Sequence, residues 1–293
     1  MGFGLPVKQL AAVAALALLG ACGVATPFSE TVASVDKAAS PRAEKSASPY
    51  AGKLLFADEF NGVEVDAGRW NRCHWWAPTG CTIASNNELE WYTPQQVEQR
   101  DGSLKLTAVR RAIRGSDGKN YDYQSGMVTT GGGTGRTAAK PKFAFRYGYL
   151  EARVRIPRGP GLWTALWLLP ATHISRPEID VFEIRGSKTD AMSMHLHTTD
   201  PKGVRKSIGE RWKGVDLADG WHVFALDWKP GSLRWLVDGV EAWRVVGDQV
   251  PAEPMYIVAN LAVGGDWPGP PTEATPFPSS FELDYVRVWS GSS

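Results

Sequence analysis

Three carboxylates lie within six residues, Glu178-Ile-Asp-Val-Phe-Glu183, in a segment whose apolar residues predict a β-strand. Side chains alternate along a regular strand, so Glu178 and Asp180 would share a face while Glu183 pointed the other way. One inserted residue, a β-bulge at Val181-Phe182, would return Glu183 to the face of the other two acids. We therefore predict a bulge there.

Two carboxyl groups on one face of a strand suit glycoside hydrolysis. A retaining glycosidase holds its two carboxyl groups about 5–5.5 Å apart. On a flat sheet the Cα atoms of Glu178 and Glu183 would lie about 13 Å apart, and long side chains on a concave sheet can close that gap. Asp180 would hydrogen-bond one Glu and keep it ionised, while burial keeps the other protonated. The spacing does not say which Glu is the acid.

The alternative is a solvated strand whose acids are neutralised by nearby cations, Arg176, Arg185 and Lys188. The neighbouring sequence favours a site instead. His195 and His197 alternate onto one face of the next predicted strand, where they can hydrogen-bond a carboxylate or a sugar hydroxyl.

The chain also has 13 Trp residues, more than a core needs. Those set in alternating strands are expected to pack in the core: Trp228, Trp235, Trp243 and Trp289. Others lie in polar or Gly/Pro-rich segments, where a flat apolar ring suits stacking on a sugar: Trp75, Trp76, Trp91 and Trp267. Aromatic caps at the ends of the core are the alternative for this second group.

The elements around these residues have an apolar period of two, which predicts half-buried strands. These segments are 103–111, 147–156, 191–200, 221–228, 233–245 and 281–289. Asp238-Gly239 is a favoured two-residue hairpin turn. Many strands without a convincing amphipathic helix predict two packed antiparallel sheets, with a cleft on the outer face of one curved sheet.

The composition suits one large globular domain, since 43% of the 293 residues are hydrophobic and 22% are charged. The formal net charge is only +1 and no long Lys/Arg run occurs, so we expect no nucleic-acid partner and no binding to an anionic membrane surface. A polysaccharide partner is allowed.

The first 22 residues resemble an export signal, with Lys8 before an apolar run that ends at Leu19-Gly20-Ala21-Cys22. Small residues before Cys22 are typical of the lipobox of bacterial lipoproteins, in which this Cys is lipidated; an ordinary cleaved signal is the alternative. The apolar run is too short for a comfortable transmembrane span. We expect a protein outside the cytoplasm, a cell-envelope lipoprotein or secreted, with a lipid anchor as its one link to a membrane.

Residues 23–49 are rich in Ala, Ser, Thr, Pro and Lys and predict a flexible linker, which leaves 50–293 as one domain. Within it, Cys73 and Cys81 predict a disulfide, because an exported protein meets an oxidising environment. A zinc site is the alternative, with only His74 nearby as a further ligand.

Several collinear motifs resemble glycoside hydrolase family 16, whose motif Glu-x-Asp-x-(x)-Glu matches 178–183. The other matching segments are "FADEFNG" at 56–62, "NNELEWYTP" at 86–94, "DGSLKLTA" at 101–108, "YGYLEARVRIPRGPGLWTALWLLP" at 147–170, "NLAVGGDWPGPP" at 260–271 and "ELDYVRVW" at 282–289. The resemblance implies an all-β fold, a concanavalin A-like jelly-roll sandwich of two antiparallel sheets with a concave substrate cleft. It also implies a retaining, endo-acting glycanase that needs no cofactor for catalysis.

The resemblance assigns roles to residues of this chain. It implies Glu178 as the nucleophile, Glu183 as the general acid/base and Asp180 as the residue that orients the nucleophile. The substrate-binding positions that it implies are Asn87, Glu88, Trp91, Trp163, Trp167, His197, Asn260 and Trp267. Relatives also hold a structural calcium ion, and Glu59, the Gly102 carbonyl and Asp284 fall where its ligands would be; oxygen ligands suit this cation.

The six-residue motif resembles the branch with laminarinases and bacterial exopolysaccharide glycanases, which implies β-1,3- or mixed β-1,3/1,4-glucan as substrate. Ser175-Arg176-Pro177, Thr164 and Met127 depart from that branch, so another β-linked glycan, such as an exopolysaccharide or galactan, stays open. A transglycosylase would use the same residues. A non-catalytic glycan-binding module would have lost one Glu, and both are present. We expect a monomer.

Overall fold

The computed structural model describes residues 50, 52–73, 81–132, 140–172 and 175–291. The compact unit spans residues 49–293. The predicted signal, the predicted linker and Cys22 lie outside the described residues. No helix in the described ranges has the length and hydropathy needed to cross a bilayer.

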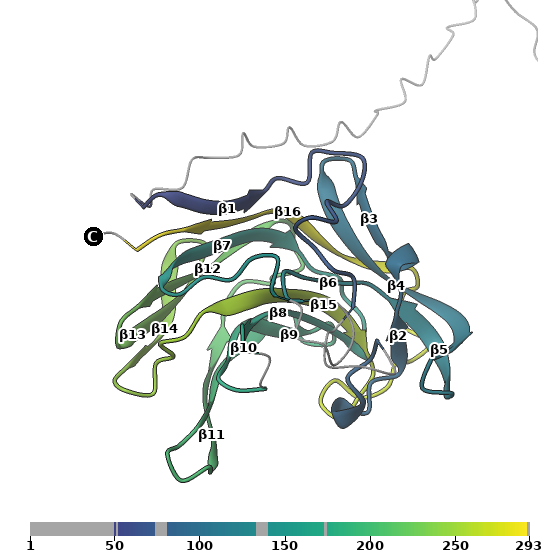
Figure 1. Ribbon diagram of the computed structural model, residues 1–293. Coiled ribbons are helices and arrows are strands. Elements are labelled where there is room, and N and C mark those ends of the chain that lie inside the picture. Colours follow the sequence, from purple (N-terminus) through teal and green to yellow (C-terminus); the bar gives the residue numbers. More distant parts are fainter. Residues whose placement is uncertain (1–49, 51, 74–80, 133–139, 173–174, 292–293) are drawn as a thin grey trace, which may run out of the picture. The chain divides into compact units, whose positions relative to one another are not determined.

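Two β-sheets pack face to face (Figure 1). The ten-stranded sheet runs in the order β14 (Val240–Val246), β13 (Ser232–Val237), β12 (His222–Lys229), β7 (Gly148–Arg155), β16 (Ser279–Trp289), β4 (Ser103–Arg114), β5 (Asn120–Ser125) and β2 (Glu90–Tyr92). In it β1 (Leu54–Asp58) pairs with β16, and β3 (Val97–Arg100) pairs with β4. The six-stranded sheet runs β11 (Arg205–Lys213), β10 (Ala191–Thr199), β9 (Glu178–Arg185), β8 (Leu162–Pro170), β15 (Met255–Val263) and β6 (Met127–Thr129).

The predicted all-β sandwich is confirmed. Two short 3₁₀ helices, η1 (Ala84–Asn86) and η2 (Pro94–Gln96), are the only helices in the described part of the chain. Pairing is antiparallel throughout the described sheets except between β2 and β5, which run parallel. The expected Asp238-Gly239 turn joins β13 to β14, and both residues have positive φ, as the favoured two-residue hairpin turn requires.

The core lies between the sheets and is filled by the inward side chains of both. Phe182 of β9 is fully buried, and its ring centroid lies 4.3 Å from that of Phe224 on β12 and 6.1 Å from that of Phe281 on β16. Of the Trp residues expected in the core, Trp228, Trp235 and Trp289 are buried, and Trp243 is partly buried and packs against the core. These contacts anchor the middle of β9 to the opposite sheet.

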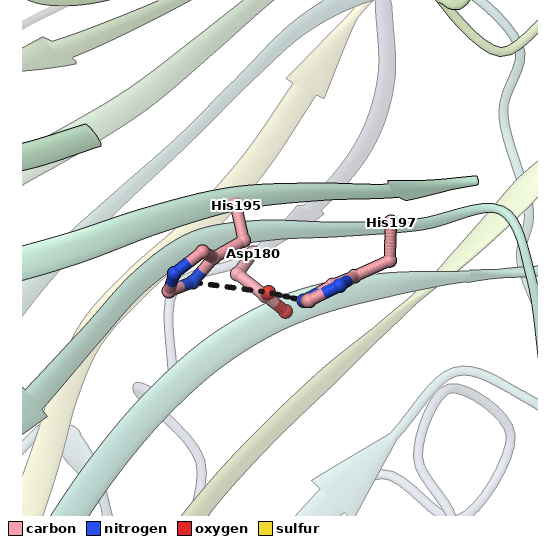
Figure 2. Close-up of side chains that lie close together, drawn as sticks. All are labelled: Asp180, His195 and His197. Carbon is pink, nitrogen blue, oxygen red and sulfur yellow. Dashed lines mark hydrogen bonds and ion pairs between the residues drawn. The ribbon is translucent and has the colours of Figure 1, made fainter. Parts of the chain in front are cut away.

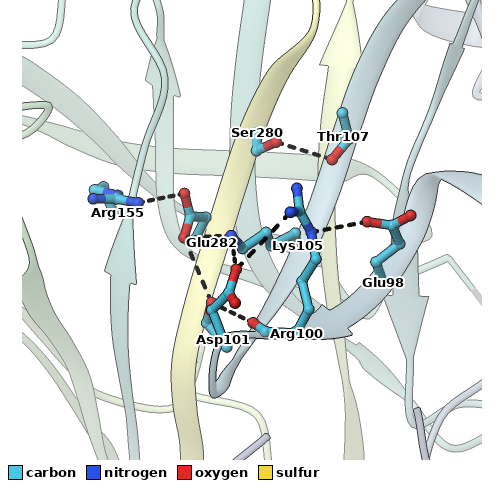
Figure 3. A network of polar contacts seen from close by, with 9 residues as sticks. Glu98, Arg100, Asp101, Lys105, Thr107, Arg155, Ser280 and Glu282 are labelled. Carbon is cyan, nitrogen blue, oxygen red and sulfur yellow. Dashed lines mark hydrogen bonds and ion pairs between the residues drawn. The ribbon is translucent and has the colours of Figure 1, made fainter. Parts of the chain in front are cut away.

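The outward face of the ten-stranded sheet carries a charged network (Figure 3). Glu282 on β16 pairs with Arg155 on β7 at 2.6 Å and faces Lys105 on β4 at 3.9 Å. Lys105 also pairs with Asp101 at 3.1 Å. Cations and carboxylates therefore alternate on this face, which explains its polar sequence without a binding role.

Candidate active site

The structure has the predicted bulge on β9. Asp180 pairs with His195 and Glu183 with Ser193, so two residues of β9 oppose a single residue of β10. The two residues of the bulge, Val181 and Phe182, are both buried. Glu178, Asp180 and Glu183 consequently line one cleft, and the predicted bulge is confirmed.

The cleft has a volume of about 720 Å³ and runs over β8, β9 and β10 of the six-stranded sheet. The substrate-binding residues expected from the resemblance that line it are Glu88, Trp163, Trp167, His197, Asn260 and Trp267. The Trp163 and Trp267 rings meet edge to face, with centroids 5.2 Å apart. An apolar floor with polar groups around the acids suits a sugar chain.

Two expected contact residues are not among those that line the cleft. The Asn87 side chain donates to both carboxylate oxygens of Asp266 at 3.1 Å, while the adjacent Asn86 lines the cleft. Trp91 is buried on β2, with its ring centroid 5.1 Å from that of Tyr121. Trp75 and Trp76 lie outside the described residues.

Burial and mutual repulsion perturb the acids. Burial, and then the neighbouring Asp180, raise the pKa of Glu178 to about 8. Burial, and then Glu183, raise the pKa of Asp180 well above its ordinary value, and Asp180 lies within hydrogen-bonding reach of Glu178. With a pKa of about 8, Glu178 is mostly protonated at neutral pH, and the raised pKa of Asp180 means that its burial also disfavours ionisation.

Two histidines of β10 point toward Asp180 of β9 (Figure 2). His197 Nε2 lies 3.1 Å from Asp180 Oδ2, and His195 Nδ1 lies 2.8 Å from Glu183 Oε2. The hydrogen bond with Glu183 raises the pKa of His195. Gly209 on β11 makes room for this ring, because a Cβ at that position would lie 2.2 Å from His195 Cδ2.

A chain of hydrogen bonds fixes the floor of the cleft. The Trp167 indole donates to Asn260 Oδ1 at 2.8 Å, and Asn260 Nδ2 donates to the Tyr92 hydroxyl at 3.0 Å. Tyr92 in turn donates to Glu88 Oε2 at 3.3 Å. Burial raises the pKa of Glu88 and, more strongly, that of the adjacent Glu90. The expected contact residues Glu88, Trp167 and Asn260 thus belong to one hydrogen-bonded chain.

The groups expected outside the cleft are placed as follows. Cys73 and Cys81 form the predicted disulfide, which excludes a zinc site at these two thiols. Glu59 accepts two hydrogen bonds from Arg287, at 2.7 and 3.0 Å, and buried Asp284 pairs with Arg153 at 3.0 Å. Arginines therefore already contact both carboxylates expected to bind calcium. The calcium site stays a prediction.

The predicted hydrogen bond between His195 and a carboxylate is present, although the resemblance assigned no role to this residue. Its contact with Glu183 depends on the bulge, which sets the register between β9 and β10. Arg176 also lines the cleft, at a position where the motif departs from its relatives, and its guanidinium donates to the Lys206 carbonyl at 3.1 Å.

Comparisons with known proteins agree with this geometry. The sequence profile of "Glycosyl hydrolases family 16" matches residues 84–286. The chain belongs to this family. It is 34% identical over 250 residues to the "Endo-1,3-1,4-beta-glycanase ExsH" of Rhizobium meliloti (strain 1021), covering 80% of this chain and 51% of that protein. It is 33% identical over 267 residues to the "Glucan endo-1,3-beta-glucosidase" of Cryptopygus antarcticus, covering 81% and 92%.

The solved structures give the same fold. The endo-beta-1,3-glucanase from Pyrococcus furiosus superposes with a TM-score of 0.72 at 31% identity, over 83% of this chain and 95% of that one. The family 16 chain spans about half the length of the Rhizobium meliloti relatives that it matches.

Proposed function

We propose that residues 50–293 hydrolyse internal β-1,3 or mixed β-1,3/1,4 linkages of a glucan with retention of configuration. The observation that carries this proposal is the bulge on β9, which turns three carboxyl groups onto the wall of one cleft. Two similar family members are named as acting on 1,3 or 1,3-1,4 linkages, which supports this substrate class.

In this proposal Glu178 attacks the anomeric carbon as a carboxylate while Glu183 gives its proton to the leaving glycosidic oxygen. A glycosyl ester forms on Glu178. Glu183, now ionised, takes a proton from water, whose oxygen attacks the same carbon and releases Glu178. Asp180, whose pKa burial raises, keeps a proton with which it hydrogen-bonds and orients the Glu178 carboxylate.

Product analysis of the purified chain on laminarin, lichenan and a galactan tests the proposal. We expect short oligosaccharides from laminarin or lichenan, and NMR should show the β-anomer as the first product. Glu178→Ala should abolish turnover, with azide restoring it as an inverted glycosyl azide. Formation of the inverted glycosyl azide by Glu183→Ala instead would reverse the roles of Glu178 and Glu183.

Other outcomes of the same assay separate the alternatives. Products longer than the substrate would show that the chain transfers sugars to a sugar acceptor. Retention on immobilised glucan without any product would mark a binding module. Cleavage of galactan alone would overturn the glucan proposal.

The N-terminal prediction and the calcium prediction need their own tests. We expect a fatty-acid probe to label the full chain in its bacterial host and Cys22→Ser to abolish the label; a label that persists would contradict lipidation. A bound calcium ion would raise the melting temperature with its concentration. An unchanged melting temperature in EDTA would contradict the calcium prediction.

A further inference from the structure

A row of cations lies beyond the acids, on the strands at the β11 edge of the six-stranded sheet. Glu183 pairs with Ser193, and Ser193 pairs with Arg211 on β11. Residues directly opposite one another point to the same face, so Arg211 lies on the cleft face two strand spacings, about 10 Å, from Glu183.

Arg211 is joined there by two further cations. A shallow depression beside the cleft is lined by Glu183, Trp267 and three cations, Arg185, Lys188 and Arg211. We call these three the cationic rim. Arg185 is half-buried, with its guanidinium carbon 4.9 Å from the Trp267 ring centroid, whereas Lys188 and Arg211 are exposed. The rim is therefore continuous with an aromatic wall of the cleft.

None of the three rim cations forms an ion pair with another residue of the described ranges. Glu210, next to Arg211, accepts from the Arg211 backbone amide at 2.9 Å, and the Glu183 carboxylate contacts His195. On the opposite sheet, by contrast, Arg155 and Arg244 each contact a carboxylate (Figure 3 shows Arg155). Like charges gathered without partners repel one another, and an anionic ligand relieves that repulsion.

The position of the cationic rim relative to Glu183 indicates which sugars of a bound glycan would contact it. Glu183, which protonates the leaving glycosidic oxygen in the proposed function, lines both the cleft and the depression that carries the rim, and β10 and β11 follow β9 in the sheet order. The sugars that leave would extend over β10 and β11. Their substituents would reach the rim.

We propose that the cationic rim binds negatively charged substituents, carboxylate or sulfate, on the leaving-group side of the β-glucan, which makes acidic glucans the preferred substrates. This inference deepens the proposed function and rests on it. An exposed ion pair contributes only modestly to binding. Removal of two rim cations should therefore lower the ratio of kcat/KM on an acidic glucan to kcat/KM on a neutral one about three- to tenfold.

The test compares two derivatives of one β-1,3-glucan with equal degrees of substitution: carboxymethyl, which is charged, and hydroxyethyl, which is neutral and of similar size. For the wild-type chain at low salt we expect a higher kcat/KM on the carboxymethyl derivative. About 1 M salt should remove the difference, since the Debye length falls to about 3 Å. A sulfated derivative shows whether the rim accepts both kinds of anion.

The variant Lys188→Ser/Arg211→Ser should lose the preference, because both side chains are exposed and their removal changes charge without disturbing the core. The control Lys202→Ser/Lys206→Ser removes two cations elsewhere on the β10–β11 hairpin and should keep it. Equal kcat/KM on both derivatives, or an undiminished preference in the rim variant, would overturn the inference. Failure to cut unsubstituted glucan would instead defeat the proposed function.

Discussion

Replacing Glu178 by glutamine should stabilise the protein at alkaline pH. Glu178 has a pKa of about 4.5 in the unfolded chain, whereas its pKa in the folded protein is about 8. Between these values folding takes up a proton, so stability is highest below pH 4.5 and falls as the pH rises to 8. A glutamine amide cannot ionise, so the variant should not show this loss.

The size of the effect follows from the interval of about 3.5 pH units between the two pKa values. Each unit corresponds to about 1.4 kcal/mol, and solvent reaches 27% of the side chain, which lowers the full value. We expect Glu178→Gln to raise the free energy of unfolding by about 2–4 kcal/mol at pH 8 and to have little effect at pH 5. The stability gain would accompany a loss of activity, as buried functional groups often show.

Urea unfolding of both proteins at pH 5, 6.5 and 8 measures this difference, provided that the slope with denaturant is unchanged. The exposed Glu273→Gln is the matched control. A gain of equal size at pH 5 and pH 8, or a variant less stable at pH 8, would refute the reasoning. The same ionisation predicts an inflection near pH 8 in the pH profile of log kcat/KM, because the nucleophile must be a carboxylate.

Three further substitutions test the surroundings of the acids. Gly209→Ala would push a Cβ into His195 and so disturb its contact with Glu183. We expect kcat to fall about tenfold or more, whereas the control Ser207→Ala on the same strand should keep the wild-type kcat. Equal kcat values for the two variants would contradict a role of this contact in catalysis. Phe182→Ala should cost about 3–5 kcal/mol of unfolding free energy, because this ring is fully buried, and a cost below about 1 kcal/mol would contradict tight packing. Cys73→Ser/Cys81→Ser should cost about 2.5 kcal/mol in urea unfolding, by the loop-closure entropy of a short loop, whereas an unchanged midpoint would contradict that stabilising role.

The sequence predicted best where one periodic rule decides the outcome. Alternation along "EIDVFE" left Glu183 on the wrong face for a paired site, so a single inserted residue was the simplest correction, and the structure has it. The strand segments and the Asp238-Gly239 turn follow from equally local rules.

The sequence predicted less where a role depends on neighbours that are far apart along the chain. Trp91 precedes a polar segment, but Tyr121 of β5 covers its ring because β2 adds to the sheet edge in parallel. The rim joins residues of β9, the β9–β10 turn and β11, and the pairing of Glu183 through Ser193 to Arg211 brings it together. No local pattern contains that pairing.

The bulge also explains how one strand can carry three neighbouring acids whose negative charges repel one another. The two residues between Asp180 and Glu183 are apolar and buried, so the segment that carries the charges also carries core contacts. The Trp235 indole, from the opposite sheet, donates to the Asp180 carbonyl at 2.9 Å and holds the backbone at this point. Burial of the Phe182 ring contributes several kcal/mol to the free energy of unfolding. This contribution offsets a loss of about the same size that accompanies ionisation of Glu178 in the folded protein. The acids stay close together because the residues between them face the core.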